Sequence, residues 1–377
     1  MIRKFGWLLV LAACTKDDTD VEGTPGEPVT FATYNGGLAI GFVDGAESRT
    51  PQVAAAVAEL DADVVCLQEI WTPEQIDAVL TASATNFPHQ YNPDAMPSEP
   101  GGDPACPDGE LDEFMTCIAD NCADSCDDEL VDCVFANCPV EFLTLEKTCQ
   151  GCVMANVGGE VQVVADECEA GNAEWAYGGS FGTILLSKLP IAEVEHHVFE
   201  STTNRRGVIH ATVEGPDNNI DVYCTHLTAV FDVIPYPREE GSWLEEQAVQ
   251  ISELTDLASE PYTVVLGDVN TGPAIGADIV AEVSENYQLF VDAGWSDAYT
   301  EGEPTCTFCG DNPLVGGGDS VLIDHIFTTV PGSWEASAPT RLFDQTIDAE
   351  TCDETFTAAL SDHYGVSVTL APVLFEE

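Results

Sequence analysis

The feature that most limits the fold is a series of short, almost continuously apolar runs, each closed by polar or turn-forming residues. Three of them are VTFATYN from residue 29, DVVCLQE from residue 63 and YTVVLGDVN from residue 262. Such runs are typical of β-strands that are covered on both faces. Stretches with helical spacing lie between them, for example residues 242–258. Strands joined by long connections, with helices outside them, predict an α/β sandwich.

The chain is strongly acidic. Its 377 residues contain 67 Asp and Glu against 10 Lys and Arg, which gives a formal net charge of -57. Such a surface repels polyanions, so we expect no large non-specific nucleic-acid footprint. Most of these charged side chains are interpreted as lying on a solvated surface. The net charge therefore bears on the choice of partner and not on the fold.

The first residues predict export. Residues 1–4 are basic at two positions and residues 5–13 form an apolar run that is too short to span a bilayer permanently. The run ends in LAAC at Cys14, which resembles a bacterial lipobox, so residues 1–14 are interpreted as a signal peptide and Cys14 as the lipidation site. The alternative is an ordinary secretory signal. Residues 15–28 are polar and contain glycine and proline, as in a flexible tether. We therefore expect a protein of the bacterial cell envelope, bound to the membrane through an N-terminal lipid, or a secreted one.

Nine of the 15 cysteines lie between Cys106 and Cys168. In an exported protein this density predicts disulfides, because the stretch lacks the paired cysteine and histidine spacing of a zinc site. Residues 98–172 are acidic and rich in cysteine, so we interpret them as an inserted subdomain of short helices joined by disulfides. The connectivity stays open, since spacing does not determine it.

Six further cysteines lie outside this stretch. Cys306, Cys309 and Cys352 are additional candidates for disulfides. Cys66 and Cys224 lie inside apolar runs, which favours buried thiols at these two positions. Cys14 is the predicted lipidation site.

Polar side chains recur where the apolar runs begin or end. They are Asn35, Glu69, His226, Asp268, Asn270, Asp324, Asp362 and His363. Each has an ordinary alternative: an amide can cap a turn, an acid can be a solvated strand end, and a histidine can be satisfied within a core. All of them together, at the strand ends where α/β folds place their chemistry, favour an active site.

These residue types suit the hydrolysis of a phosphoester with a hard cation. Carboxylate and amide oxygens without a nearby thiolate favour Mg²⁺, or else Mn²⁺ or Ca²⁺, over zinc. Such an ion orients the phosphate and neutralises the charge that develops on it. Two histidines could then act as general base and general acid, because a carboxylate partner fixes the tautomer of an imidazole and makes it more basic.

The motifs TYN, LQE, THL, GDVN, IDHIF and SDH occur in this order. In that order they resemble the endonuclease/exonuclease/phosphatase family, which includes pancreatic-type deoxyribonuclease, abasic-site endonucleases, inositol polyphosphate 5-phosphatases and neutral sphingomyelinases. The resemblance implies a four-layer α/β sandwich, in which helices flank two packed mixed β-sheets. It implies a catalytic domain over residues 29–371, interrupted by the insertion at 98–172, and a metal-dependent phosphoric ester hydrolase.

The same resemblance implies a metal site and a phosphate contact. Glu69 is then the principal metal ligand, with Asn35 beside it. Asp362 contributes to the metal site or to its water shell. Arg206, in NRRGV, lies where family members often carry a basic residue near the phosphate, although a surface pair with the preceding arginine is the alternative.

It also implies catalytic roles. His363 is the expected general base for the attacking water, oriented by Asp324. His226 contacts the phosphate and protonates the leaving oxygen. Asp268 and Asn270 position water and the phosphate oxygens.

The substrate is less closely defined than the reaction. The motif CTHLTA and a later helix containing EEQ resemble the sphingomyelinase-type members more than the deoxyribonucleases, so a phospholipid is favoured. An extracellular deoxyribonuclease-like endonuclease is the first alternative. The second is a non-catalytic cell-surface binding protein that uses the Cys-rich insertion.

Overall fold

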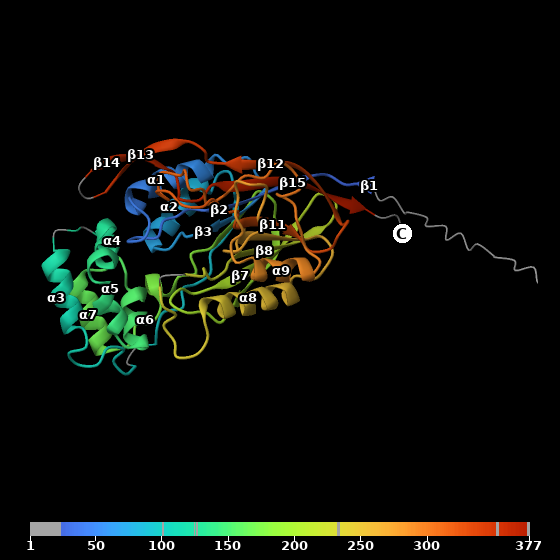
Figure 1. Ribbon diagram of the computed structural model, residues 1–377. Helices are drawn as coiled ribbons and strands as arrows, with labels where there is room; N and C mark the ends of the chain where they lie inside the picture. Colours follow the sequence, from blue (N-terminus) through green and yellow to red (C-terminus); the bar gives the residue numbers. More distant parts are fainter. Residues whose placement is uncertain are drawn as a thin grey trace, which may run out of the picture.

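The computed structural model describes residues 24–99, 102–123, 125, 127–231, 234–351 and 354–374. Two β-sheets pack face to face with helices on their outer sides, and a further group of helices lies at one end of the sandwich (Figure 1). The predicted fold class, a four-layer α/β sandwich with a Cys-rich insertion, is confirmed. The predicted signal peptide with Cys14 and most of the tether lie outside the described residues, as do Cys126 and Cys352.

The first sheet has seven strands in the described chain, in the order β1-β15-β2-β3-β5-β4, and β12 also pairs with β15. Their bounds are β1 Thr24–Pro25, β2 Val29–Asn35, β3 Val64–Gln68, β4 His89–Tyr91, β5 Ile184–Ser187, β12 Trp334–Leu342 and β15 Gly365–Leu374. Only β2 and β3 are parallel among these pairs, and Asn35 lies opposite Gln68 at their carboxyl ends.

The second sheet has six strands within the same ranges, in the order β10-β11-β9-β8-β7-β6. Their bounds are β6 Ile191–Val198, β7 Gly207–Glu214, β8 Asn219–His226, β9 Thr263–Asp268, β10 Ser296–Asp297 and β11 Asp324–Thr328. Here β8 and β9 form the parallel pair. A separate hairpin consists of β13 Thr346–Glu350 and β14 Thr355–Ala359.

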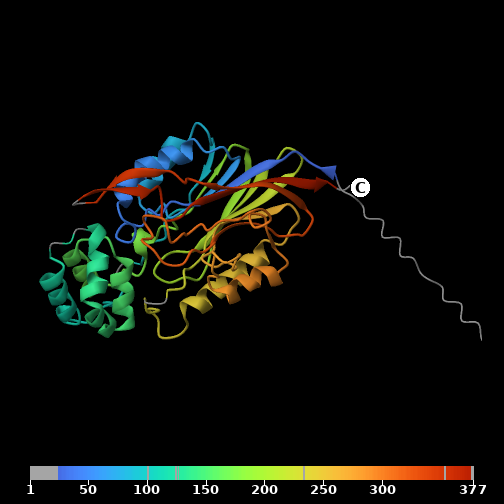
Figure 2. The same ribbon diagram turned by 45° about the horizontal axis from the view of Figure 1, so that its top comes forward.

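Helices cover the outer face of each sheet (Figure 2). On the first sheet they are α1 Ala46–Ala58 and α2 Pro73–Ser83, and on the second α8 Trp243–Leu257 and α9 Ser284–Asp292. Val53 and Val57 of α1 are fully buried against Val65 and Leu67 of β3, so β3 is covered on its helix side as its apolar run predicts. No helix in the described ranges is both long enough and apolar enough to cross a bilayer.

A disulfide joins the two sheets through the core. Cys66 of β3 and Cys224 of β8 are fully buried among apolar side chains of both sheets, and their sulfur atoms are bonded. The prediction of buried thiols at these positions was wrong. The sequence around a cysteine in an apolar strand does not reveal whether the facing sheet places a second cysteine opposite it. Here the two cysteines are 158 residues apart in the sequence, so no local pattern connects them.

The Cys-rich stretch folds into five helices among its described residues, followed by the 3₁₀ helix η1 Ala176–Gly179. The five are α3 Asp112–Asn121, α4 Asp127–Asn137, α5 Pro139–Thr144, α6 Lys147–Ala155 and α7 Val161–Ala170. Their disulfides are Cys106–Cys149, Cys117–Cys138, Cys122–Cys133 and Cys152–Cys168. The prediction of short helices joined by disulfides is confirmed, whereas the exact boundaries of 98–172 stay a prediction.

The disulfide between the sheets should stabilise the sandwich more than a local one. We expect Cys66→Ala/Cys224→Ala to lower the free energy of unfolding by about 2–5 kcal/mol, because the bond closes a long loop in the unfolded chain. The control is Cys306→Ala/Cys309→Ala, which removes a disulfide with a sequence separation of only 3. Urea denaturation followed by circular dichroism measures both. Equal losses in the two variants would contradict the prediction.

Candidate active site

The pairing of the strands brings the predicted polar residues to one edge of the sandwich. In the first sheet, Asn35 ends β2 and lies opposite Gln68, the last residue of β3. In the second sheet, His226 at the end of β8 pairs with Asp268 at the end of β9. Asp268 also pairs with Asp324, which begins the antiparallel strand β11. Five strand ends from distant parts of the chain therefore meet at this edge.

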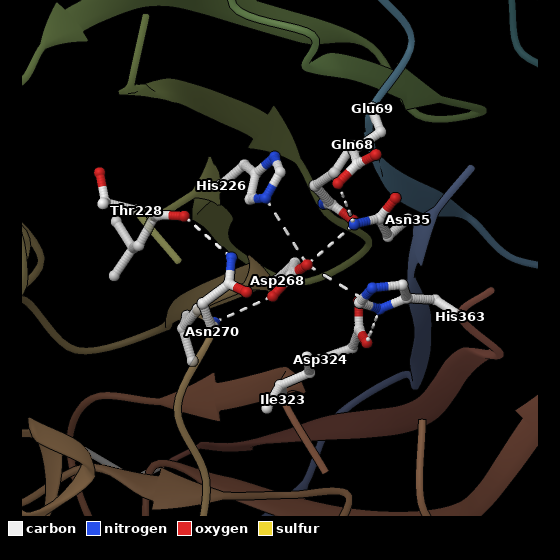
Figure 3. A network of polar contacts seen from close by, with 12 residues as sticks. Asn35, Gln68, Glu69, His226, Thr228, Asp268, Asn270, Ile323, Asp324 and His363 are labelled. Carbon is white, nitrogen blue, oxygen red and sulfur yellow. Dashed lines mark hydrogen bonds and ion pairs between the residues drawn. The ribbon is translucent and has the colours of Figure 1, made fainter. Parts of the chain in front are cut away.

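Asp268 lies at the centre of the group (Figure 3). Its side chain is 1% exposed. Asn35 Nδ2 donates to Asp268 Oδ2 over 2.8 Å, and the backbone N–H of Asn270 donates to Oδ1 over 2.9 Å. The same Oδ2 lies 3.6 Å from His226 Nε2 and 3.8 Å from His363 Nδ1. Burial, followed by the charge of Asp324, raises the pKa of Asp268 to about 7, so this carboxyl group is placed where a cation would stabilise its charged form.

His363 forms a close pair with Asp324. The His363 Nδ1 atom lies 2.8 Å from Asp324 Oδ2, and both side chains are buried. Burial alone would lower the pKa of His363, but the charges of Asp324, Asp268 and Asp362 outweigh it and raise that pKa well above its usual value. The pairing fixes the imidazole with its other nitrogen, Nε2, left to meet a ligand.

His226 has the opposite electrostatic setting. Burial lowers its pKa well below the usual value, and the charges of Arg206 and His363 add to this effect. Among the described residues, neither His226 Nδ1 nor Arg206 Nη1 has a hydrogen-bond partner, although both atoms are buried. Buried polar atoms are normally paired. Both residues line the cleft, so these two atoms are available to a polar ligand.

Glu69 adopts an unusual backbone conformation directly after β3. Its φ angle is 56°, in the left-handed region that residues other than glycine rarely adopt. Asn35 Nδ2 also donates to Glu69 Oε1 over 3.1 Å. Burial and then the charge of Asp362 raise the pKa of Glu69. Asn270, after β9, has a similar φ of 52°, and strained residues of this kind cluster at functional sites.

Asp362 and His363 lie in the turn just before β15 and not within the strand itself. The hydroxyl of Ser361 donates to Asp362 Oδ1 over 3.0 Å, and Asn312 Nδ2 donates to the backbone carbonyl of Asp362 over 3.1 Å. Both Asp362 and His363 line the same cleft as Glu69. The turn therefore brings two further groups to the strand ends.

The cleft has a volume of about 440 Å³. Its polar part contains Glu69, Arg206, His226, Asp268, Asn270, Asp362 and His363. Many apolar side chains also line it: Phe42, Val43, Trp71, Met154, Val230, Phe231, Ile234, Trp243, Phe308 and Val321. Thr202, Thr203, Asn204, Thr228 and Glu282 are further polar lining residues. Asn35 and Asp324 do not line the cleft themselves, but Asn35 is hydrogen-bonded to Asp268 and Asp324 to His363. All nine predicted catalytic, metal and phosphate residues thus lie in or beside one cleft, while their roles stay predictions.

A sequence profile described as the endonuclease/exonuclease/phosphatase family matches residues 35–363. The chain belongs to this family. The match spans both sheets and the Cys-rich insertion, and membership supports a metal-dependent phosphoesterase.

Solved structures agree with the fold. Sphingomyelinase C from Streptomyces griseocarneus is 16% identical with a TM-score of 0.54, over 91% of this chain and 99% of that one. Beta toxin from Staphylococcus aureus with bound magnesium ions is 15% identical, also with a TM-score of 0.54 and the same coverage. An endonuclease/exonuclease/phosphatase from Beutenbergia cavernae is 15% identical with a TM-score of 0.50, over 92% of this chain and 72% of that one. No curated protein matches the sequence.

The donor set fits a hard divalent cation, as family membership implies. Buried carboxylates with raised pKa values surround the cleft floor, and Asp324 Oδ1 is buried without a hydrogen-bond partner in the described structure. Asp268, Asp324 and His363 bring possible ligand atoms within 4.8 Å of one another. However, the His363–Asp324 contact of 2.8 Å turns these two atoms toward each other. The family resemblance implies an ion nearer Glu69, Asn35 and Asp362, and that position stays a prediction.

The sequence reasoning assigned no role in the cleft to a set of residues that shapes it, although the EEQ motif includes one of them, Glu246. Glu246 of α8 is 8% exposed and accepts hydrogen bonds from the hydroxyls of Thr202, Thr228 and Tyr236. It thereby connects three segments around the cleft. The available signal was an acid on the buried face of an amphipathic helix, which by itself does not reveal its partners. Tyr177, stacked on Trp71 at 5.0 Å between ring centroids, was missed as well.

Mg²⁺ should stabilise the protein through Glu69. We expect saturating Mg²⁺ to raise the melting temperature by several degrees, because an ion at 100 times its Kd adds about 2.7 kcal/mol. Glu69→Gln should lose most of this rise yet remain folded, since it removes one of several mutually repelling carboxylates. Differential scanning calorimetry with Mg²⁺ and with chelator measures the effect, and Glu74→Gln on α2 is the matched control. An equal rise in Glu69→Gln would place the ion elsewhere.

Proposed function

We propose that the protein is a divalent-metal-dependent phosphodiesterase that hydrolyses a phospholipid in the manner of a sphingomyelinase. The observation that carries the proposal is the pair of buried histidines, His226 and His363, on either side of Asp268 at the bottom of a cleft with apolar walls. Imidazoles held by carboxylates can move protons near neutral pH. A cleft that combines charged groups with many apolar side chains suits a substrate that is itself amphiphilic.

The proposed reaction is attack of water on phosphorus. The bond from phosphorus to the leaving oxygen breaks as the new one forms. His363 takes a proton from the water, with Asp324 holding its ring, and His226 gives a proton to the leaving oxygen. Arg206, buried with an unpaired Nη1 atom, binds a phosphate oxygen. Asn270 and Asp268 position water and phosphate beside them.

The electrostatics explain why this chemistry needs a cation. Without one, the surrounding carboxylates raise the pKa of His363, which favours the protonated ring that cannot act as a base. A divalent cation beside Glu69 and Asp362, when bound, polarises the phosphate and offsets these negative charges. The negative phosphate in turn favours protonation of His226, whose pKa is lowered in the free protein.

The surface supports a lipid more than a nucleic acid. Phe42 and Phe231 line the cleft, yet they are 49% and 42% exposed. A formal net charge of -57 opposes an extended polyanion. Sphingomyelinase C from Streptomyces griseocarneus also shares the fold.

Export is part of the proposal. Six disulfides link cysteines in the described residues, which supports an oxidising compartment. The predicted signal peptide and lipidation at Cys14 would then keep the enzyme at the outside of a bacterial cell envelope. Such a lipid anchor would place the cleft within reach of a membrane substrate.

Turnover of defined substrates tests the proposal. The purified protein is assayed with sphingomyelin vesicles, duplex DNA and bis(4-nitrophenyl) phosphate, each with Mg²⁺, with Ca²⁺ and with chelator. We expect metal-dependent hydrolysis of sphingomyelin and of the aryl diester. His363→Gln should lower kcat/KM by about 10²–10⁴-fold, which is typical for removal of a general base or acid.

The matched control is His197→Gln. His197 lies on β6 of the second sheet. Its side chain is 47% exposed, pairs with Glu253 and does not line the cleft. It should retain full activity. Hydrolysis of DNA alone would replace the lipid proposal by the nuclease alternative. A folded, metal-loaded protein that hydrolyses none of the three would contradict the enzymatic proposal.

A further inference from the structure

The Cys-rich insertion contains an apolar pocket of about 90 Å³. Side chains from α3 to α7 line it, among them Phe114, Ile118, Val134, Phe142 and Val164. Asn156 is the one polar side chain among the described residues that line it, and its Nδ2 already donates to the backbone carbonyls of Cys152 and Ala173. A charged or polar ligand would find no partner here, so the lining selects an apolar one.

This pocket adjoins the catalytic cleft. Met154, the penultimate residue of α6, lines both spaces. The turn that follows packs against the loop at the cleft rim: a Cβ on Gly158 would lie 3.1 Å from Ile40, and one on Gly41 would lie 2.8 Å from Val157. The pocket and the cleft therefore adjoin at Met154 and at this apolar turn.

The insertion also packs against a second segment of the cleft wall, residues 230–243. Trp243 belongs to the same buried cluster as the insertion's cysteines, and Val230 and Ile234 pack against that cluster. All three residues line the cleft as well. Lys147 Nζ donates to the backbone carbonyl of Tyr236 over 2.6 Å. The apolar surface is thus continuous from the cleft wall into the insertion.

We propose that the pocket in the insertion receives the far end of one alkyl chain of the substrate while the phosphate is held at the cleft floor. The inference rests on the proposed phosphodiesterase function. An apolar cavity of about 150 Å³ holds a benzene ring, so the smaller pocket has room for a few carbons and not for a whole chain. The remaining methylenes then lie along Met154 and the apolar side of the cleft. The insertion is therefore a chain-length selector for an amphiphilic phosphodiester.

The test uses substrates that differ only in their chain. These are 4-nitrophenyl phosphodiesters whose second ester is methyl, hexyl or dodecyl, kept below their micelle concentrations and assayed with Mg²⁺. Each methylene that becomes buried should raise kcat/KM by up to about fourfold. We expect the dodecyl ester to be preferred over the methyl ester by at least about a hundredfold.

Variants in the pocket then locate the chain. Ala165 on α7 is 5% exposed and lines the pocket, so Ala165→Leu fills it. This change should reduce the dodecyl-to-methyl ratio at least about tenfold and leave the methyl rate unchanged. Val163→Leu is the matched control, because Val163 lies on the same helix but is 51% exposed.

A second variant tests the pocket independently in case Ala165→Leu does not fold. Val134→Thr keeps the side-chain volume and places a hydroxyl in the pocket, which should lower the dodecyl-to-methyl ratio about fivefold or more. Near-ultraviolet circular dichroism checks that each variant is folded.

The outcomes separate the two proposals. If no ester is hydrolysed, the proposed function fails. If the methyl ester is hydrolysed without any preference for longer chains, the phosphodiesterase stands and the pocket inference is wrong. If the preference exists but neither Ala165→Leu nor Val134→Thr reduces it, the chain binds elsewhere and the inference is again overturned.

Discussion

The site depends on one hydrogen bond between the two sheets. Asn35 at the end of β2 donates to Asp268 at the end of β9 over 2.8 Å, and both side chains are buried. Each sheet contributes one parallel pair of strands whose carboxyl ends point to the same edge, and the sandwich holds these ends against each other. A buried carboxylate is costly unless it is paired. Asp268 therefore requires its neighbours Asn35 and Asn270, and their positions define where the histidines meet the substrate.

The α/β sandwich and the polar strand ends followed from local patterns, whereas the four layers, Arg206 and the role of each site residue came from the family resemblance, and these roles stay predictions. Apolar runs identify buried strands, and a polar residue at the end of each run is visible without a structure. Pairs across the fold are not visible in this way. The Cys66–Cys224 disulfide could not be predicted, because a buried cysteine has the same local sequence whether it stays a free thiol or faces a second cysteine in the other sheet. The backbone of Glu69 is also a product of tertiary constraint, because no local signal demands a positive φ for glutamate.

The insertion lies beside the cleft, so its proposed effect on what the sandwich binds comes from its position and not from its chemistry. It carries no group of the catalytic centre, and its helices are held by four disulfides among the described residues. A small group of helices gains stability from such bonds. It rests on the segment before α8 that also forms one wall of the cleft. The acidic exterior then leaves the cleft as the place where a neutral or apolar partner is accepted.

The most direct test of this account is the position of the metal. A crystal grown with Mn²⁺ and measured at the manganese absorption edge locates the ion by its anomalous scattering. We expect the strongest peak at coordination distance from the Glu69 carboxylate, beside Asn35 and within reach of Asp362, with open positions that face His226 and Arg206. A peak only on the acidic exterior, or none in the cleft of a crystal soaked at saturating Mn²⁺, would contradict the assignment of the strand ends as a metal-dependent phosphoesterase site.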